Sequence, residues 1–272
     1  MWRTCVSLCL FAIMILLSGC GGGSSPMVSS QPVSIVFNGN YEFAAISQSS
    51  PANNFFLRGF LRNNSTGSFD IPVSDVNLTN TCLKGILSSL IATLSGKVDS
   101  GGSFTLKLTA APSTDQMNIN ATISQDGQTI SNGSYTIGRD CADSGTVTGF
   151  AVRPFTGTYK GSVKTSSGTV GATLVIDTQG SATTAFGSFP LTGSVVFTNT
   201  GICDPTLAGF FGTQLALDGS AAGASLSLHT APNPEFVAVE ISGLATSGTA
   251  NTIQATARIS TCIPPTITLT RQ

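Results

Sequence analysis

Residues 104–108 read Phe-Thr-Leu-Lys-Leu, and residues 117–123 read Met-Asn-Ile-Asn-Ala-Thr-Ile. Apolar and polar side chains alternate in both segments, so an extended backbone would place them on opposite faces. Such alternation is typical of antiparallel strands that bury one face and leave the other in water. Residues 237–242, Val-Ala-Val-Glu-Ile-Ser, repeat the pattern in the second half of the chain. The sequence therefore predicts an all-β protein.

Turn residues separate the alternating segments. Glycine and asparagine reach positive φ at low cost, so short clusters that contain them favour tight reversals. We expect reversals at Ser100-Gly101-Gly102, Asp126-Gly127, Asn132-Gly133 and Asp218-Gly219. The expected strands of the first half begin near Tyr41, Phe55, Phe69, Leu83, Phe104, Met117, Ile130 and Val147.

The spacing of four cysteines indicates a tandem duplication. Cys82 and Cys141 lie 59 residues apart. Cys203 and Cys262 have the same spacing, 121 residues further along the chain. Equal spacing at a fixed displacement is typical of internal repeats.

Segments without cysteine recur at nearly the same displacement. Gly67-Ser68-Phe69 recurs at residues 187–189, and the Leu-x-Leu-x-x-Ala-Pro pattern of residues 106–112 recurs at 226–232. The chain is therefore predicted to consist of a signal peptide (1–19), a tether (20–35) and two β-domains (36–154 and 155–272).

Four cysteines allow three disulfide pairings. The repeat selects Cys82–Cys141 and Cys203–Cys262, because a bond inside one unit could exist before the duplication and survive it. On a chain-entropy model, closing a loop of this length stabilises each unit by roughly 4 kcal/mol. We expect both disulfides in an oxidising compartment.

Eight antiparallel strands per repeat predict two tandem up-and-down β-barrels, a fold without exposed sheet edges. The alternative fold is a tandem of immunoglobulin-like sandwiches. Those domains bury a tryptophan against the disulfide and carry a tyrosine two residues before the second cysteine. Here the single tryptophan is Trp2, and Arg139 and Ser260 stand two residues before Cys141 and Cys262.

In each repeat the first expected strand begins with Gly-x-Tyr, and the last expected strand ends with an arginine. The tyrosines are Tyr41 and Tyr159, and the arginines Arg153 and Arg271 are displaced by the same 118 residues. This pattern resembles the lipocalin and avidin barrels, in which a Gly-x-Trp opens the first strand and a basic side chain from the last strand packs over the ring. The resemblance implies that the two arginines close the barrels over the tyrosines. A cation over an aromatic ring contributes roughly 0.5 to 2 kcal/mol.

The N-terminus combines one charge, Arg3, with an apolar run over residues 5–17. This is the pattern of an export signal, because the run is too short to cross a bilayer comfortably. The following Leu17-Ser18-Gly19-Cys20 resembles the lipobox of bacterial lipoprotein precursors at all four positions. The resemblance implies cleavage before Cys20 and lipid on its thiol. An ordinary secretory signal is the alternative.

Glycine, serine and proline dominate from Gly21 to about Pro32, as in a flexible tether. In the lipoprotein family an aspartate after the lipidated cysteine retains the protein at the inner membrane, and Gly21 stands there instead. We therefore expect the membrane partner to be the outer membrane, reached through lipid on Cys20.

Charged residues make up only 9% of the chain, with 12 basic and 13 acidic side chains. Nucleic-acid binding requires a clustered basic surface, so this composition argues against a nucleic-acid partner. Loss of Arg3 with the signal would leave 11 basic residues against 13 acidic ones, a net charge of −2.

Few side chains suit catalysis or metal binding. His229 is the single histidine, on the polar side of an expected strand, where histidines are usually solvated. Zinc requires several histidine or cysteine ligands. Asp140 and Asp143 are the densest pair of oxygen ligands for calcium, although a loop beside Cys141 explains them equally well. We expect no catalytic site, metal or cofactor.

The leading functional hypothesis is a membrane-anchored binding module for a small molecule, a glycan or an envelope protein. The second is a structural spacer with filled barrels, and the third is a hydrolase. The phenylalanines expected to fill the barrels are Phe55, Phe56, Phe60 and Phe69, and in the second repeat Phe186, Phe189, Phe197, Phe210 and Phe211. An accessible cavity above about 300 Å³ would favour binding.

Overall fold

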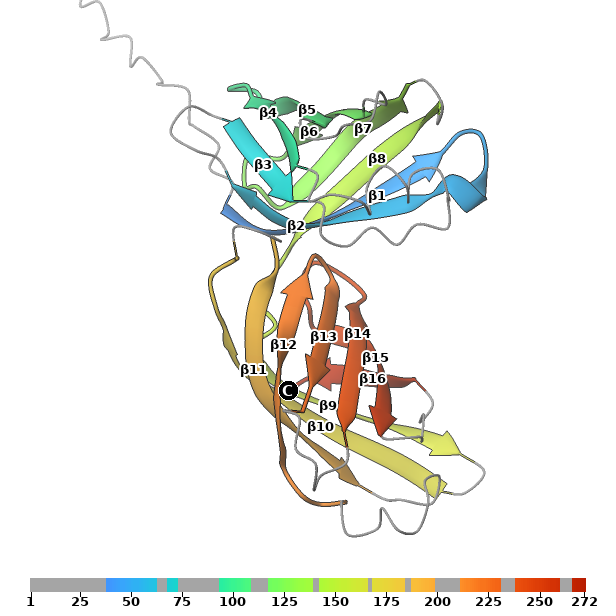
Figure 1. Ribbon diagram of the computed structural model, residues 1–272, viewed down its shortest axis with the longest axis vertical. Coiled ribbons are helices and arrows are strands. Elements are labelled where there is room, and N and C mark those ends of the chain that lie inside the picture. Colours follow the sequence, from blue (N-terminus) through green and yellow to red (C-terminus); the bar gives the residue numbers. More distant parts are fainter. Residues whose placement is uncertain are drawn as a thin grey trace, which may run out of the picture. The chain divides into compact units, whose positions relative to one another are not determined.

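The computed structural model is all-β, as the sequence predicts. It describes residues 38–62, 68–72, 93–108, 117–138, 142–165, 168–183, 187–198, 211–230, 238–259 and 266–272. Their strands form two eight-stranded antiparallel sheets, one from β1–β8 and one from β9–β16 (Figure 1). A short 3₁₀ helix, η1 (Pro51–Asn53), lies between the first two strands.

The first sheet has the strand order β2-β1-β8-β7-β6-β5-β4-β3. The strands are β1 (Asn38–Ser47), β2 (Phe55–Arg62), β3 (Ser68–Pro72), β4 (Thr93–Val98), β5 (Ser103–Leu108), β6 (Met117–Ile123), β7 (Thr129–Ile137) and β8 (Asp143–Val152). This is the cyclic order of an up-and-down barrel that is open between β2 and β3. These two strands contact each other, but no ladder joins them within the described ranges.

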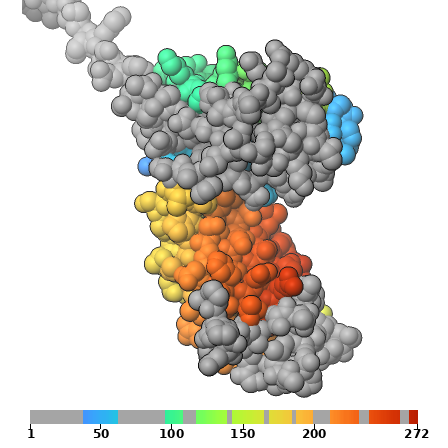
Figure 2. Space-filling model, in the orientation of Figure 1, coloured from blue at the N-terminus to red at the C-terminus, as the bar shows by residue number. Residues whose placement is uncertain are grey.

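The second sheet is a closed barrel, because β16 pairs with β9. Its strands are β9 (Gly157–Thr165), β10 (Gly168–Gln179), β11 (Phe189–Thr198), β12 (Leu215–Ala222), β13 (Ser225–His229), β14 (Val239–Ala245), β15 (Thr252–Ile259) and β16 (Ile267–Arg271). Its strands form a continuous surface from yellow to red in Figure 2. The prediction of two tandem barrel-like domains is confirmed, and the sandwich alternative is excluded because each unit is one curled sheet.

Apolar side chains fill the inside of the closed barrel. Buried and exposed residues alternate along its strands, as in β14 and β15, so each strand sends every second side chain inward. The core includes Tyr159, Leu174, Ile176, Leu191, Phe197, Leu217, Leu228, Ile241, Ile253 and Leu269. Within the described ranges, the barrel's own apolar side chains therefore make up its interior.

The phenylalanines that were expected to fill the barrels differ in how deeply they are buried. Phe55 is buried in the core of the first sheet and meets Tyr135 edge-to-face, with ring centroids 5.0 Å apart. Phe56 and Phe60 are only half-buried. Phe197 belongs to the core of the barrel and Phe211 packs against it. The side chains of Phe69, Phe186 and Phe210 lie outside the described part of the structure.

Two of the four expected reversals are turns. Gly102 and Gly127 both have positive φ, +87° and +70°, in the β4–β5 and β6–β7 connections. The other two predictions are wrong, because Asn132-Gly133 lies within β7 and Asp218-Gly219 within β12.

At these two places the glycines lie where a strand is closely approached by its neighbour or bends. A Cβ on Gly219 would lie 2.0 Å from the carbonyl oxygen of Ser227 on β13, so only glycine permits this close approach. Asn132 has φ +52° where the pairing of β7 with β8 shifts register between Ile130 and Gly133. This irregularity is a β-bulge, which bends the strand without reversing it.

The fourth strand of the first sheet differs from the prediction. The strand expected near Leu83 falls in residues 73–92, outside the described ranges, and β4 begins at Thr93. A Cβ on Gly96, in the middle of β4, would lie 1.8 Å from the carbonyl oxygen of Thr105. The glycine that allows this contact also weakens the alternating pattern by which strands are recognised.

Candidate functional site

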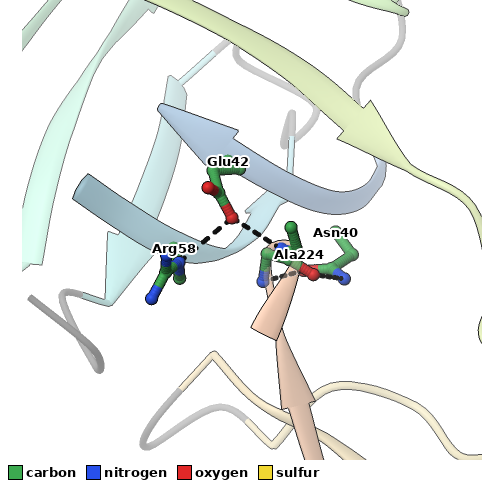
Figure 3. Close-up of polar contacts among 5 residues, drawn as sticks. Asn40, Glu42, Arg58 and Ala224 are labelled. Carbon is green, nitrogen blue, oxygen red and sulfur yellow. Dashed lines mark hydrogen bonds and ion pairs between the residues drawn. The ribbon is translucent and has the colours of Figure 1, made fainter. Parts of the chain in front are cut away.

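The tip of the β12–β13 hairpin packs against the outer face of β1 and β2 (Figure 3). Glu42 of β1 and Arg58 of β2 form an ion pair there, with Arg58 Nε 3.0 Å from Glu42 Oε2. The backbone N–H of Ala224 donates to the same oxygen at 2.7 Å. Both charged side chains are buried, each residue being 6% exposed. Extra hydrogen bonds of this kind offset the hydration that a buried ion pair loses.

Asn40 adds two hydrogen bonds to the same hairpin. Asn40 Nδ2 donates to the Gly223 carbonyl at 2.7 Å, and the Gly223 N–H donates to Asn40 Oδ1 at 2.6 Å. Gly223 has φ +55°, as the first position of a two-residue hairpin turn can require. A Cβ there would also lie 2.7 Å from Arg58 Cγ. The turn and the contact both require glycine at this position.

The polar side chains that β1 contributes to this contact differ from the residues at the matching positions of β9. Counted from Tyr41 and Tyr159, the residues of β9 that correspond to Asn40 and Glu42 are Thr158 and Lys160, and Lys160 is exposed. Sequence reasoning missed the contact, because polar residues on the outer face of a strand are ordinarily solvated. The signal that was present, Glu42 opposite Arg58, can be recognised only when the β1–β2 register is known.

A pocket of about 640 Å³ borders this contact. Its walls come from the start of β1, the β6–β7 turn, the end of β8 and the connections that flank β9 and β10. Among the described residues that line the pocket, Asp126 and Arg153 are charged. Phe189 forms part of the wall and meets Phe60 edge-to-face, with centroids 5.7 Å apart. The pocket thus combines polar, charged and aromatic groups outside both apolar cores.

Tyr41 lies at the inner side of this pocket. Its ring is buried, and its hydroxyl donates to the carbonyl of Gly127 in the β6–β7 turn at 2.8 Å. Burial, and secondarily the negative charge of Asp126, raise the pKa of Tyr41 to about 12. The hydroxyl therefore stays protonated and keeps one lone pair directed away from the bond that it donates.

Tyr159 has the corresponding place in the second barrel. Its hydroxyl donates to the carbonyl of Ala250 in the β14–β15 turn at 3.0 Å. Arg271 packs over its ring, with the guanidinium carbon 5.1 Å from the centroid, and donates to the hydroxyl through Nε at 3.1 Å. Arg271 Nη2 also donates to the carbonyl of Pro154 at 2.7 Å. Burial raises the pKa of Tyr159, and the hydrogen bond and charge of Arg271 oppose that rise.

Arg153 does not occupy the same position over Tyr41. Tyr159 pairs across the ladder with Arg271, whereas Tyr41 pairs with Ala151, two residues before Arg153. The Arg153 side chain is exposed, and among the described residues no hydrogen bond or cation–π contact joins it to Tyr41. The expectation of a second closing arginine is therefore corrected: the displacement of 118 residues aligns the first strands but misplaces the last ones by two.

Of the two candidate calcium ligands, the structure describes Asp143 alone. Asp140 lies outside the described residues. Asp143 is buried, which by itself would raise its pKa, but the hydroxyls of Ser49, Tyr135 and Ser47 hold the pKa below its ordinary value. These bonds already occupy the carboxylate. No group of three or more metal-ligating side chains is found in the part of the chain that the structure describes.

The single histidine lies on the outer surface of the barrel. His229 is exposed at the end of β13, with Asp218 and Glu240 as its ladder partners on the neighbouring strands. No hydrogen bond or ion pair joins it to another side chain among the described residues. This position is that of a solvated surface side chain.

The lipidation site and the proposed disulfides lie outside the described residues. Cys20 falls in residues 1–37, and Cys82, Cys141, Cys203 and Cys262 fall in the gaps 73–92, 139–141, 199–210 and 260–265. Those cysteine-containing gaps connect β3 to β4, β7 to β8, β11 to β12 and β15 to β16. Within the described ranges, none of the helices has the length and apolar character needed to cross a membrane.

Comparisons with known proteins found no relative. No protein-family model matches the chain, and neither the curated proteins nor the solved structures contain a match.

Proposed function

We propose that the protein is a lipid-anchored binding module of a bacterial cell envelope, with its ligand in the pocket beside Tyr41. The observation that carries this proposal is where open space lies. Apolar side chains line the described interior of the closed barrel, whereas one pocket of about 640 Å³ borders the contact between the two sheets and is lined by polar and charged groups. A volume of this size is typical of small-molecule sites.

The anchor is supported by the lipobox-like residues 17–20 and the Gly/Ser/Pro tether that follows. Two or three acyl chains hold a protein firmly at a bilayer, whereas a single chain does not. Cells grown with a radioactive fatty acid should label the wild-type protein and not the Cys20→Ala variant. Label that persists in the variant would contradict the anchor.

The pocket can be tested before its ligand is known. Thr156 lines the pocket and is exposed, so Thr156→Trp should fill space there while leaving both cores intact. Thr169, exposed on β10 and outside the pocket, provides the matched control Thr169→Trp. The mature chain and both variants would be titrated by NMR with a panel of sugars, short peptides, carboxylates and amines.

We expect one chemical class to bind the wild type and Thr169→Trp and to lose binding in Thr156→Trp. If no class binds, or if binding is unchanged in Thr156→Trp, the pocket is not the functional site.

A structural spacer is the second candidate, supported by the filled barrel and by the buried ion pair against Ala224. Such a contact joins the two sheets without any ligand. Failure of the panel would favour this role.

A further inference from the structure

One polar side chain of the pocket wall, Gln179 at the end of β10, is held by the protein through only one of its two polar atoms. Gln179 Oε1 accepts the backbone N–H of Phe155 at 2.9 Å, and Phe155 is buried in the core of the closed barrel. Gln179 Nε2 has no partner among the residues that the structure describes. The half-buried amide therefore supplies the pocket wall with an oriented hydrogen-bond donor.

The β6–β7 turn supplies acceptors to the same pocket. Asp126 Oδ1 accepts from the Ser124 hydroxyl and from the Gln128 N–H, whereas Asp126 Oδ2 has no partner in the described part of the chain. These two bonds also hold the pKa of Asp126 below its ordinary value, so the carboxyl is ionised at neutral pH. Gln128 Nε2 donates to the Asp126 carbonyl at 3.2 Å, and Gln128 Oε1 is likewise unpaired within the described ranges.

The charges that line the pocket balance. Asp126 is negative and Arg153 is positive, and the two side chains form no ion pair with each other in the described structure. A ligand with a net charge therefore meets one attractive and one repulsive group, and it loses hydration without full compensation. A neutral ligand avoids this cost. The lining thus favours a ligand that is polar but uncharged.

The inner side of the pocket is closed by buried side chains. The Tyr41 ring and the Asn40 amide are buried, and their polar groups already have partners in the protein. Val152, Pro154 and Phe189 form an apolar part of the wall. The groups that can meet a ligand are therefore the unpaired amide and carboxylate atoms and this apolar wall.

We propose that this pocket binds a neutral saccharide. The inference rests on the proposed binding function and specifies the ligand's chemistry. Each sugar hydroxyl donates one hydrogen bond and accepts others, so sugar hydroxyls can accept from Gln179 Nε2 and donate to Asp126 Oδ2 and Gln128 Oε1. The C–H groups on the faces of a sugar ring are apolar and suit the apolar part of the wall. A carboxylate has no donor for the acceptors of the turn, and an ammonium group has no acceptor for Gln179.

The probes are neutral trisaccharides of glucose, galactose, mannose or N-acetylglucosamine, together with the charged trimers of galacturonate and glucosamine. The galactose and galacturonate trimers, and the N-acetylglucosamine and glucosamine trimers, are pairs matched in ring stereochemistry. We expect the mature chain to bind at least one neutral probe in an NMR titration, and to bind both charged probes at least about tenfold more weakly. Absence of binding by every neutral probe, or a charged probe that binds as tightly as the best neutral one, would overturn the inference.

Gln179→Glu tests the assigned donor. The variant keeps an oxygen for the Phe155 N–H and replaces Nε2 by a second oxygen, so the affinity for the neutral probe should fall at least about tenfold. The added negative charge should also shift the preference towards the glucosamine trimer, which loss of structure would not do. The matched control is Gln254→Glu, because Gln254 is exposed on β15 outside the pocket and its Oε1 also accepts a hydrogen bond, from Thr268. The control should leave the affinity unchanged.

Asp126→Asn provides an independent variant. It keeps Oδ1 as the acceptor for Ser124 and Gln128 and replaces the unpaired acceptor by a donor, so the affinity should fall about tenfold. Unchanged affinity in both Gln179→Glu and Asp126→Asn would contradict the assignment. If the neutral probes fail while Thr156→Trp blocks binding of a charged ligand, this inference falls and the proposed binding function stands.

Discussion

The two tyrosine ends combine one backbone arrangement with different residues in the last strand. At the end of the closed barrel, Arg271 covers Tyr159, binds its hydroxyl and reaches the carbonyl of Pro154. At the corresponding end of the first sheet, Ala151 lies opposite Tyr41, and the buried ring itself comes within 3.6 Å of the Cβ position of Gly39. The same position of the last strand therefore carries an arginine in the closed barrel and an alanine in the first sheet.

The outer faces of β1 and β9, which are the first strands of the two sheets, also differ. In β1 the outward side chains of Asn40 and Glu42 are buried against the β12–β13 hairpin. In β9 the corresponding Lys160 is exposed to solvent. The polar contact therefore combines the outer face of β1 with the β12–β13 hairpin, and residues of both sheets line the pocket beside it.

The largest effect is expected from Glu42→Ala. The substitution leaves Arg58 without its buried counter-ion and the Ala224 N–H without its acceptor, which should cost about 3–5 kcal/mol. Lys160→Ala, at the matching position of β9, should change stability by less than about 0.5 kcal/mol. Urea-induced unfolding followed by circular dichroism measures both. Similar values for the two variants would refute the asymmetry between the strands.

Next in size is the removal of the arginine over Tyr159. Arg271→Ala loses two side-chain hydrogen-bond partners and the ring contact, and we expect a loss of about 2 kcal/mol from the free energy of unfolding. Arg153→Ala should change it by less than about 0.5 kcal/mol, because that side chain is exposed. A destabilising Arg153→Ala would restore the idea of a second closing arginine.

Removal of a single hydroxyl from each tyrosine compares the stability that the two side chains contribute. Tyr41→Phe gives up one hydrogen bond, to Gly127, and should cost about 1 kcal/mol. Tyr159→Phe gives up the bond to Ala250 and also removes one of the two acceptors of Arg271, so its cost should be greater. Thermal unfolding of the two variants side by side gives the difference, and the reverse ranking would contradict the role given to Arg271.

The smallest effect concerns alkaline pH. Because the folded pKa of Tyr41 is about 12 and the ordinary value is 10, the stability from its neutral form is complete below pH 10 and is lost as the pH rises towards 12. All three tyrosines of the chain, Tyr41, Tyr135 and Tyr159, have raised pKa values. Ultraviolet absorbance should therefore detect little tyrosinate in the folded chain at pH 10.

In the same titration, the Arg271→Ala variant distinguishes the pKa of Tyr159 from that of Tyr41. Arg271 opposes the rise in the pKa of Tyr159, so its removal should move that pKa further up and leave Tyr41 unchanged. A titration curve identical to that of the wild type would show that Arg271 does not act on Tyr159.

Much of the fold could be predicted from alternation. The segments 104–108 and 117–123 are strands β5 and β6, because side chains that alternate in polarity can satisfy one buried and one wet face only when extended. The errors fall on glycines. Gly219 and Gly133 look like turn residues, yet they lie in strands where a neighbouring backbone comes too close for a Cβ.

The candidate site was harder to predict. Tyr41 and Tyr159 were recognised from their Gly-x-Tyr pattern, but the residue opposite each ring depends on the register of the last strand. A shift of two residues, invisible in the spacing of the arginines, places an arginine opposite one ring and an alanine opposite the other. Glu42 and Arg58 lack any distinguishing pattern, because the hairpin that buries them lies far away in the chain.

By itself, the sequence determined that the protein is all-β with two barrel-like domains, because local alternation and turn chemistry act between residues close together in the chain. Only the tertiary structure decided where these domains differ. Whether an arginine covers a tyrosine, and whether a glutamate is buried or solvated, depends on which distant segment lies against it. Such contacts are set by register and packing, which local patterns do not encode.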